Sequence, residues 1–185
     1  MRNEKLKTYL LHILLLFIMV LPSCNHKKEE VHNVIIERYS MNKFQSSDTS
    51  SLIIREKENR LEHYFGLEII DGQESFFSQS FQIDTNNISK IFSWQTQLPL
   101  VDEKNYLVNN KKKIVRKYYY DDEKSIDEEA YYFIMDNRLV SYNSAAWNIQ
   151  YFYEYEDSTI IGLLKNDTTS FFCRNCDVDM SKLLK

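Results

Sequence analysis

Short apolar and aromatic runs alternate with polar turns from Asn33 onward, and no long segment has the roughly 3.6-residue period of an amphipathic helix. The alternation is clearest where Tyr151, Tyr153 and Tyr155 fall on one side of an extended chain and the intervening residues on the other. A period of two is typical of strands with one buried face. The pattern therefore predicts a single all-β domain over residues 33–185.

Turn-forming residues separate the expected strands at intervals of about 8–12 residues. The strongest hairpin signal is Asp71-Gly72, and the similar segments 58–61 (Glu-Asn-Arg-Leu) and 136–139 (Asp-Asn-Arg-Leu) are each expected to form a tight hairpin connection. Strands are expected over the runs 34–36, 52–54, 61–70, 75–83, 114–120, 130–135, 139–142, 148–155, 159–164 and 170–172. This spacing predicts an antiparallel meander that forms a barrel, a sandwich or a strongly curved sheet.

Three segments are expected to lie outside the sheet. Residues 46–51 contain only serine, threonine and aspartate, a composition that indicates a loop. Residues 88–97 and 181–185 are the candidates for one or two short helices. All other regular structure is expected to be strand.

The N-terminal residues have the pattern of an export signal. Arg2, Lys5 and Lys7 form a positive segment, and residues 8–20 are almost wholly apolar. That apolar run is too short to cross a membrane comfortably, because a spanning helix needs about 20 residues, but it has the length of the apolar part of a signal peptide. An uncleaved anchor helix and a buried core helix are the two alternatives.

The segment Leu21-Pro22-Ser23-Cys24 resembles the lipobox of bacterial lipoproteins, in which an aliphatic residue and then a small residue precede the cysteine that receives the lipid. The resemblance implies that residues 1–23 are cleaved and that Cys24 carries palmitate-type acyl chains in a membrane. Residues 24–32 are polar and charged, and are expected to form a tether.

The tether also bears on the expected location in the cell envelope. Lys28-Glu29-Glu30 resembles the tag that directs some lipoproteins to the outer face of the outer membrane, although a solvated linker would have the same composition. Asn25 is not the aspartate associated with retention in the inner membrane. The outer membrane is therefore the expected location.

Composition narrows the classes of partner. Removal of residues 1–23 would leave 162 of the 185 residues, enough for one sizeable core, with a formal net charge of −6. An acidic balance argues against a nucleic-acid partner, which requires clustered positive charge. With 13 Tyr and 11 Phe the chain is rich in residues that favour strands. We expect no cofactor.

Cys173 and Cys176 are the two cysteines that remain once Cys24 is lipidated. In an oxidising compartment an even number of cysteines favours a disulfide. Reduced thiols, redox catalysis and a metal site are the alternatives, but no second Cys or His pair nearby completes a zinc site. We therefore expect a disulfide and no bound metal.

Other polar residues favour structural roles. His63 stands alone and is expected to be a surface or half-buried residue, while His26 and His32 lie in the expected tether. The acidic runs 121–123 and 127–129 lack the ligand spacing of a calcium loop and indicate a solvated turn. Lys111-Lys112-Lys113 is expected to protect a strand edge.

Tyrosines offer the main candidate for a binding face. Tyrosine presents a large amphipathic contact area, and the candidates lie at alternate positions of two expected strands. Their alternative role is to fill the core. The candidate residues are Tyr118, Tyr120, Tyr151, Tyr153 and Tyr155.

These observations favour a lipid-anchored, non-enzymatic envelope protein that binds a protein partner, either as an accessory subunit or as an immunity-type protein. A module that binds a small molecule or glycan, on a tyrosine-rich face or in a barrel mouth, is the second class. A hydrolase whose site is assembled from scattered residues is the third. No segment has a recognisable catalytic pattern.

Overall fold

A computed structural model confirms that the domain is all-β. It describes residues 29–66, 68–70, 73–75, 80–93, 95–121, 129–155 and 160–172, with backbone only for 68–75. The strands of this part are β1 (Glu29–Ser40), β2 (Lys43–Lys57), β3 (Arg60–Phe65), β4 (Glu68–Ile70), β5 (Gln73–Ser75), β6 (Phe81–Asp84), β7 (Asn87–Ser93), β8 (Thr96–Leu98), β9 (Leu100–Val108), β10 (Lys111–Tyr120), β11 (Ala130–Met135), β12 (Arg138–Ser144) and β13 (Ile149–Glu154). One short helix, α2 (Ile160–Lys165), accompanies them in the described part.

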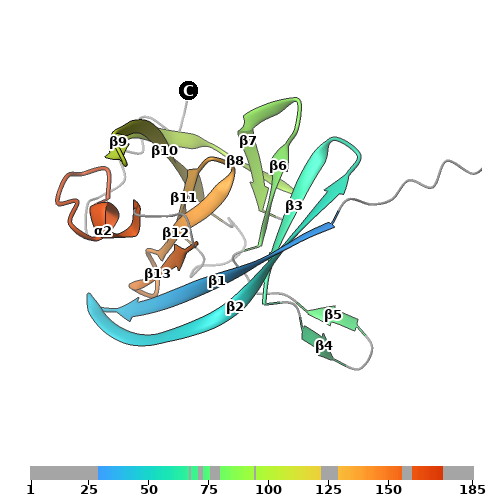
Figure 1. Ribbon diagram of the computed structural model, residues 1–185, viewed down its shortest axis with the longest axis horizontal. Coiled ribbons are helices and arrows are strands. Elements are labelled where there is room, and N and C mark those ends of the chain that lie inside the picture. Colours follow the sequence, from blue (N-terminus) through green and yellow to red (C-terminus); the bar gives the residue numbers. More distant parts are fainter. Residues whose placement is uncertain are drawn as a thin grey trace, which may run out of the picture.

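Eleven of these strands form one antiparallel sheet in the order β8-β7-β6-β3-β2-β1-β13-β12-β11-β10-β9. Consecutive strands pair along each half, except that β3 pairs with β6 because β4 and β5 form a separate two-stranded sheet. The two halves join where β1 pairs with β13. The edges β8 and β9 are consecutive in the chain, separated only by Pro99. The sheet therefore curls until its edges meet (Figure 1), and the Pro99 carbonyl accepts a 3.1 Å hydrogen bond from the Tyr119 amide. Of the three expected shapes, the strongly curved sheet is the one observed. No ladder of backbone hydrogen bonds joins its two edge strands in the described part of the chain.

Tight two-residue turns connect the longest pairs of strands. Both turn residues have positive φ in the β1–β2 turn (Met41, Asn42), the β9–β10 turn (Asn109, Asn110) and the β11–β12 turn (Asp136, Asn137). Positive φ at both positions is the requirement of a type I′ hairpin, and Asn and Asp accept it more easily than most residues. The predicted hairpins at 58–61 and 136–139 are confirmed.

Each face of the curved sheet contributes to a core. The inner core fills the concave side and contains Val34, Leu52, Phe65, Phe81, Ile83, Ile91, Leu98, Tyr118, Tyr132, Ile134, Leu139, Tyr153 and Tyr155. On the opposite face α2 and the turn after it cover an outer core made of Tyr106, Val108, Val115, Phe133, Val140, Phe152, Ile160, Ile161, Leu164, Phe171 and Phe172.

The bounds of β1 and β2 differ from expectation in two places. Residues 29–32, assigned to the tether, belong to β1 and pair with residues 52–55 of β2. Residues 46–51 are not a loop but the middle of β2, paired with β1. Backbone hydrogen bonds to a neighbouring strand hold polar segments in extended form without an apolar face.

Three further expectations are wrong. Residues 88–97 form β7 and most of β8 instead of a helix. Residues 159–164 were expected to be a strand, but Ile160 begins α2, and residues 170–172 form a turn. Short apolar runs fit a buried helix and a buried strand equally well. The second candidate helix, 181–185, lies outside the described residues.

A buried carboxylate ties the segment after α2 to strand β9. The Asp167 side chain is only 3% exposed, and Lys104 Nζ donates to its Oδ2 at 2.7 Å. The Tyr106 hydroxyl donates to the same oxygen, and the Thr169 hydroxyl donates to Oδ1 at 2.7 Å. Burial disfavours the charge, but these hydrogen bonds outweigh it and lower the pKa of Asp167 to about 2.

We expect Asp167→Asn to lower the free energy of unfolding at pH 7 by about 2 kcal/mol, because hydrogen bonds to a charged group contribute roughly 1.5–3 kcal/mol. The folded pKa lies below the unfolded value, so this stabilisation is present above pH 4 and is lost as the pH falls from about 4 to about 2. Urea unfolding at pH 7 and pH 3 measures both effects. Asp48→Asn, at an exposed site on β2, is the control. Equal losses in the two variants would contradict the prediction.

Candidate functional site

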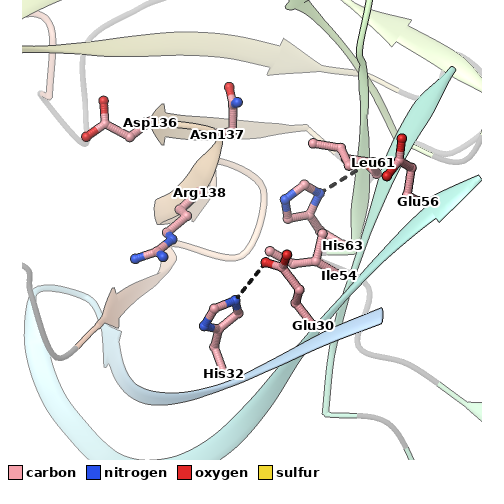
Figure 2. Close-up of a pocket in the computed structure, with 9 residues that line it drawn as sticks. All are labelled: Glu30, His32, Ile54, Glu56, Leu61, His63, Asp136, Asn137 and Arg138. Carbon is pink, nitrogen blue, oxygen red and sulfur yellow. Dashed lines mark hydrogen bonds and ion pairs between the residues drawn. The ribbon is translucent and has the colours of Figure 1, made fainter. Parts of the chain in front are cut away.

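A pocket of about 220 Å³ opens beside the inner core, at the end of the sheet where β1 begins (Figure 2). We call it the mouth pocket. Strands β1, β2 and β3 form one side, and the β11–β12 turn reaches over from the other half of the sheet. Its lining residues are Glu30, His32, Ile54, Glu56, Leu61, His63, Asp136, Asn137 and Arg138.

Strand register explains why these side chains meet. Glu30 pairs with Ile54, and Ile54 pairs with His63, so the three side chains form one row across β1, β2 and β3. Directly paired residues of neighbouring strands share a face. His32 lies two positions after Glu30 and therefore projects to the same side. This side is the concave one, because Val34 follows in the inner core.

His63 is the most enclosed polar residue of the pocket, with 1% of its surface exposed. Its ring stacks on Phe81 at a centroid distance of 4.4 Å, and Nδ1 lies 3.1 Å from the Leu61 carbonyl oxygen. Burial lowers the pKa of His63 to about 4, against the smaller opposing effect of the Leu61 and Asn137 carbonyls. His63 is therefore an uncharged part of the pocket wall at neutral pH.

Charged and polar groups surround this wall. Nε2 of His32 is buried, has no hydrogen-bond partner, and lies 3.7 Å from Glu30 Oε2. The Arg138 guanidinium lies over the Tyr155 ring, 5.3 Å from its centroid. Asp136 forms an ion pair with Lys113. Glu56 is a further carboxylate that lines the pocket.

The pocket thus combines an apolar surface, made by Ile54 and Leu61, with groups of both charge signs. Such a combination suits a polar ligand of limited size, because pockets for drug-sized molecules have volumes of roughly 300–1,000 Å³. Over the residues that the structure describes, no three His, Cys, Asp or Glu side chains are grouped so that they could hold a metal ion.

The candidate tyrosines do not form an exposed face. Tyr118, Tyr153 and Tyr155 are buried in the inner core, while Tyr120 and Tyr151 are partly buried and pack against it. Their alternation places them on the concave side of the curved sheet, where their neighbours cover them. The five tyrosines therefore have the core-filling role that was the alternative interpretation.

The cysteines lie outside the described residues. Cys24, Cys173 and Cys176 fall in the ranges 1–28 and 173–185. Lipidation of Cys24 and a disulfide between the other two stay predictions. No helix in the described part of the chain is long and apolar enough to cross a membrane.

Sequence reasoning missed the mouth pocket because it treated its histidines separately. His32 was placed in the tether and His63 was expected at the surface or half-buried, whereas His63 is buried. One signal was available: Glu30, His32 and Val34 alternate in the manner of a strand that enters the domain four residues earlier than expected. The contribution of Arg138 depends on the curl of the sheet.

Comparisons with known proteins identify no relative. No protein-family model, no curated protein and no solved structure matches this chain.

Proposed function

We propose that this chain is a lipid-anchored protein of the bacterial envelope that binds a protein partner, without catalysis, through an exposed apolar end of its sheet. The single observation that carries the proposal is the exposure of Met41, Phe44 and Trp147, which are 71%, 56% and 62% exposed. Large side chains of these types are enriched at protein interfaces. We call these three residues the apolar end.

The three residues of the apolar end lie in or beside two turns that are joined by a backbone hydrogen bond. The Met41 amide donates a 3.1 Å hydrogen bond to the Asn148 carbonyl, which joins the β1–β2 turn to the turn that contains Trp147. Phe44 lies on the outer face, where its ring makes an edge-on contact with the Tyr39 ring, with 5.6 Å between the ring centroids. Three large apolar side chains thus lie around two neighbouring turns.

The conformation of Met41 also supports a binding role. Its φ is 47°, in the left-handed region that asparagine and glycine occupy more readily. Because the Met41 side chain is exposed, its burial within the domain does not offset the cost of this backbone conformation. Strained and exposed residues are concentrated at functional sites. A partner that covers Met41 would explain why an apolar residue with positive φ occupies this exposed turn.

A buried polar side chain lies close to the apolar end. Gln150 is 3% exposed, yet neither atom of its side-chain amide has a hydrogen-bond partner. It lines a cavity of about 20 Å³ together with Ala145 and Asn148, which lie two residues before and one residue after Trp147 in the chain. Unpaired buried amide atoms cost roughly 1–3 kcal/mol each, so this part of the domain beside the apolar end is locally destabilised.

The apolar end also lies far from the expected anchor. Strand β1 has 12 residues, and at about 3.3 Å per residue it spans roughly 40 Å. Glu29, the residue of β1 nearest to Cys24 in the chain, is at one end and the β1–β2 turn is at the other (Figure 1). A lipid on Cys24 would leave the apolar end free to project from the membrane surface.

Site-specific photo-crosslinking in cells tests the proposal. We expect a crosslinking amino acid at position 44 or 147 to give one discrete protein adduct, and the same residue at position 88 to give none. Ile88 is the matched control because it is also apolar and exposed but lies on β7, several strands away. We expect Trp147→Ala to weaken binding of the identified partner by about 2 kcal/mol, or roughly 30-fold. Equal labelling at position 88, or adducts with lipid alone, would overturn the proposal.

A further inference from the structure

We infer that the protein partner proposed above contributes an extended segment of its chain, which pairs as an added strand with a free edge of β2. This binding mode rests on the proposed function, because the same partner also covers the apolar end. Three features of β2 support it: unpaired backbone groups, the absence of the usual protection of a sheet edge, and a position beside the apolar end.

Strand β2 has a neighbouring strand on only one side over residues 43–51. Strand β1 pairs with β2 from Lys43 onward, whereas β3 pairs only with residues 52–57. Gly66 follows β3 with a φ of 58°, and the next strand, β4, pairs with β5 instead of β2. No strand in the described part of the chain pairs with the other side of residues 43–51, which we call the free edge (Figure 1).

One hydrogen bond shows which backbone groups point outward at the free edge. The Gly66 amide donates to the Ser51 carbonyl at 3.0 Å, so the Ser51 carbonyl points away from β1. Successive residues of a strand direct their amide and carbonyl groups to opposite sides, and the register with β1 is unbroken over residues 46–51. Ser47 and Thr49 therefore direct their amide and carbonyl groups outward, and both residues are exposed.

The free edge lacks the protection that the two edge strands of the sheet have. Natural sheets protect their edges by short strands, by charged side chains or by bulges. Strand β8 has only three residues, and β9 carries the charged residues 102–104 in its middle. Residues 46–51 contain only serine, threonine and Asp48, with no lysine, proline or bulge. Their small side chains leave room for a further strand.

The free edge continues from the apolar end. Phe44 belongs to the same strand, and at about 3.4 Å per residue Thr49 lies roughly 17 Å further along it. A protein interface of ordinary size covers roughly 800 Å² of each partner, so one partner can contact both sites. In strand addition, backbone hydrogen bonds supply affinity and side-chain contacts supply specificity. The apolar end would provide the side-chain contacts here.

A second copy of this chain fits the free edge poorly. Two copies related by a two-fold axis would pair antiparallel, and the use of all the outward groups would place Ser47 of one copy opposite Thr49 of the other. The two Asp48 side chains would then lie directly opposite each other. Like charges at directly opposite positions are destabilising, so a different protein is the better partner.

Two substitutions at one position test the added strand in the full-length protein, with the photo-crosslinking amino acid at position 147 as the probe. Proline is tolerated at a sheet edge where the amide that it removes points away from the paired strand. We expect Thr49→Pro to weaken binding of the crosslinked partner about tenfold, because an outward hydrogen bond is lost and a carbonyl of the partner is left unpaired. Thr49→Ala is the matched control and should bind normally, because it keeps the amide.

Hydrogen exchange on the unmodified protein decides the question even if Thr49→Pro does not fold. We expect the amides of Ser47 and Thr49 to exchange about tenfold or more slowly in the complex with the crosslinked partner, because hydrogen-bonded amides exchange only when the structure opens locally. The amide of Asn110, in the β9–β10 turn, should be unchanged.

The outcomes separate the added strand from the proposed function. Normal binding by Thr49→Pro with unchanged exchange at Ser47 and Thr49 would refute the added strand and leave the contact at the apolar end standing. No discrete adduct from position 44, 47, 49 or 147 would refute both. An adduct from position 49 with twice the mass of this chain would identify a second copy as the occupant and would also refute the inference.

Discussion

Cys24→Ala is expected to abolish the membrane attachment of this chain, either by releasing the domain or by stalling it as an uncut precursor. Each buried CH₂ of an acyl chain contributes about 0.8 kcal/mol, so two or more chains make attachment effectively permanent. The domain without residues 1–23 has a formal net charge of −6 and would be repelled by anionic lipid head groups. Membrane fractionation with metabolic fatty-acid labelling measures the effect.

Cys173→Ala is the matched control for the anchoring experiment, because it also removes one cysteine but lies far from the lipobox. It should keep its fatty-acid label and stay in the membrane fraction. If the Cys24→Ala protein is cut normally and remains in the membrane, the lipoprotein interpretation fails. The N-terminal apolar segment would then have to act as a transmembrane anchor.

Tyr118→Ala is expected to lower the free energy of unfolding by about 3–5 kcal/mol, the loss seen when large aromatic residues are truncated in a core. Tyr118 is fully buried, and its hydroxyl donates a 3.0 Å hydrogen bond to the Ser89 carbonyl. The contact joins β10 to β7, which belong to different halves of the sheet. Urea unfolding of the two proteins measures the difference.

Tyr118→Phe separates packing from hydrogen bonding and should cost only about 1 kcal/mol. Burial raises the pKa of Tyr118 to about 12. A folded pKa above the unfolded one means that the stabilisation is present below pH 10 and is lost as the pH rises from about 10 to about 12. The Phe variant should lack this part of the alkaline loss. Similar costs for the Ala and Phe variants would contradict the assignment of Tyr118 to the inner core.

The sequence identified the fold class because residues of both cores alternate along the strands. The expected strand 130–135 has the same bounds as β11, since Tyr132 and Ile134 face the inner core while Phe133 faces the outer one. The hairpin at 136–139 was equally predictable, because Asp and Asn accept the positive φ of a type I′ turn.

Elements that depend on distant contacts were not predictable. Residues 46–51 have no apolar face, and only their pairing with β1 makes them a strand. Ile160, Ile161 and Leu164 are buried at a helical spacing, but a run of five apolar residues does not distinguish a helix from a strand. The shape of the sheet was left open because the meeting of its edges at Pro99 depends on curvature accumulated over many strands.

The mouth pocket could be predicted only in part. A strand over residues 29–32 would have placed Glu30 and His32 beside His63 through the register of β1, β2 and β3. Arg138 enters the pocket from the β11–β12 hairpin, more than seventy positions after His63 in the chain. No local sequence pattern predicts that Arg138 approaches His63, because the approach depends on the pairing of β1 with β13.

The ladder between β1 and β13 joins the first and last strands of the described part of the chain, for example at Ile35 and Glu154. Closure of so long a loop is entropically unfavourable and makes folding slow. A chain that crosses a membrane from its N-terminus exposes one edge of β1, with its unpaired amide and carbonyl groups, until β13 has followed. An edge of this kind is a template for aggregation. If the domain is exported as we propose, we expect a holding factor to cover β1 until the C-terminal half arrives.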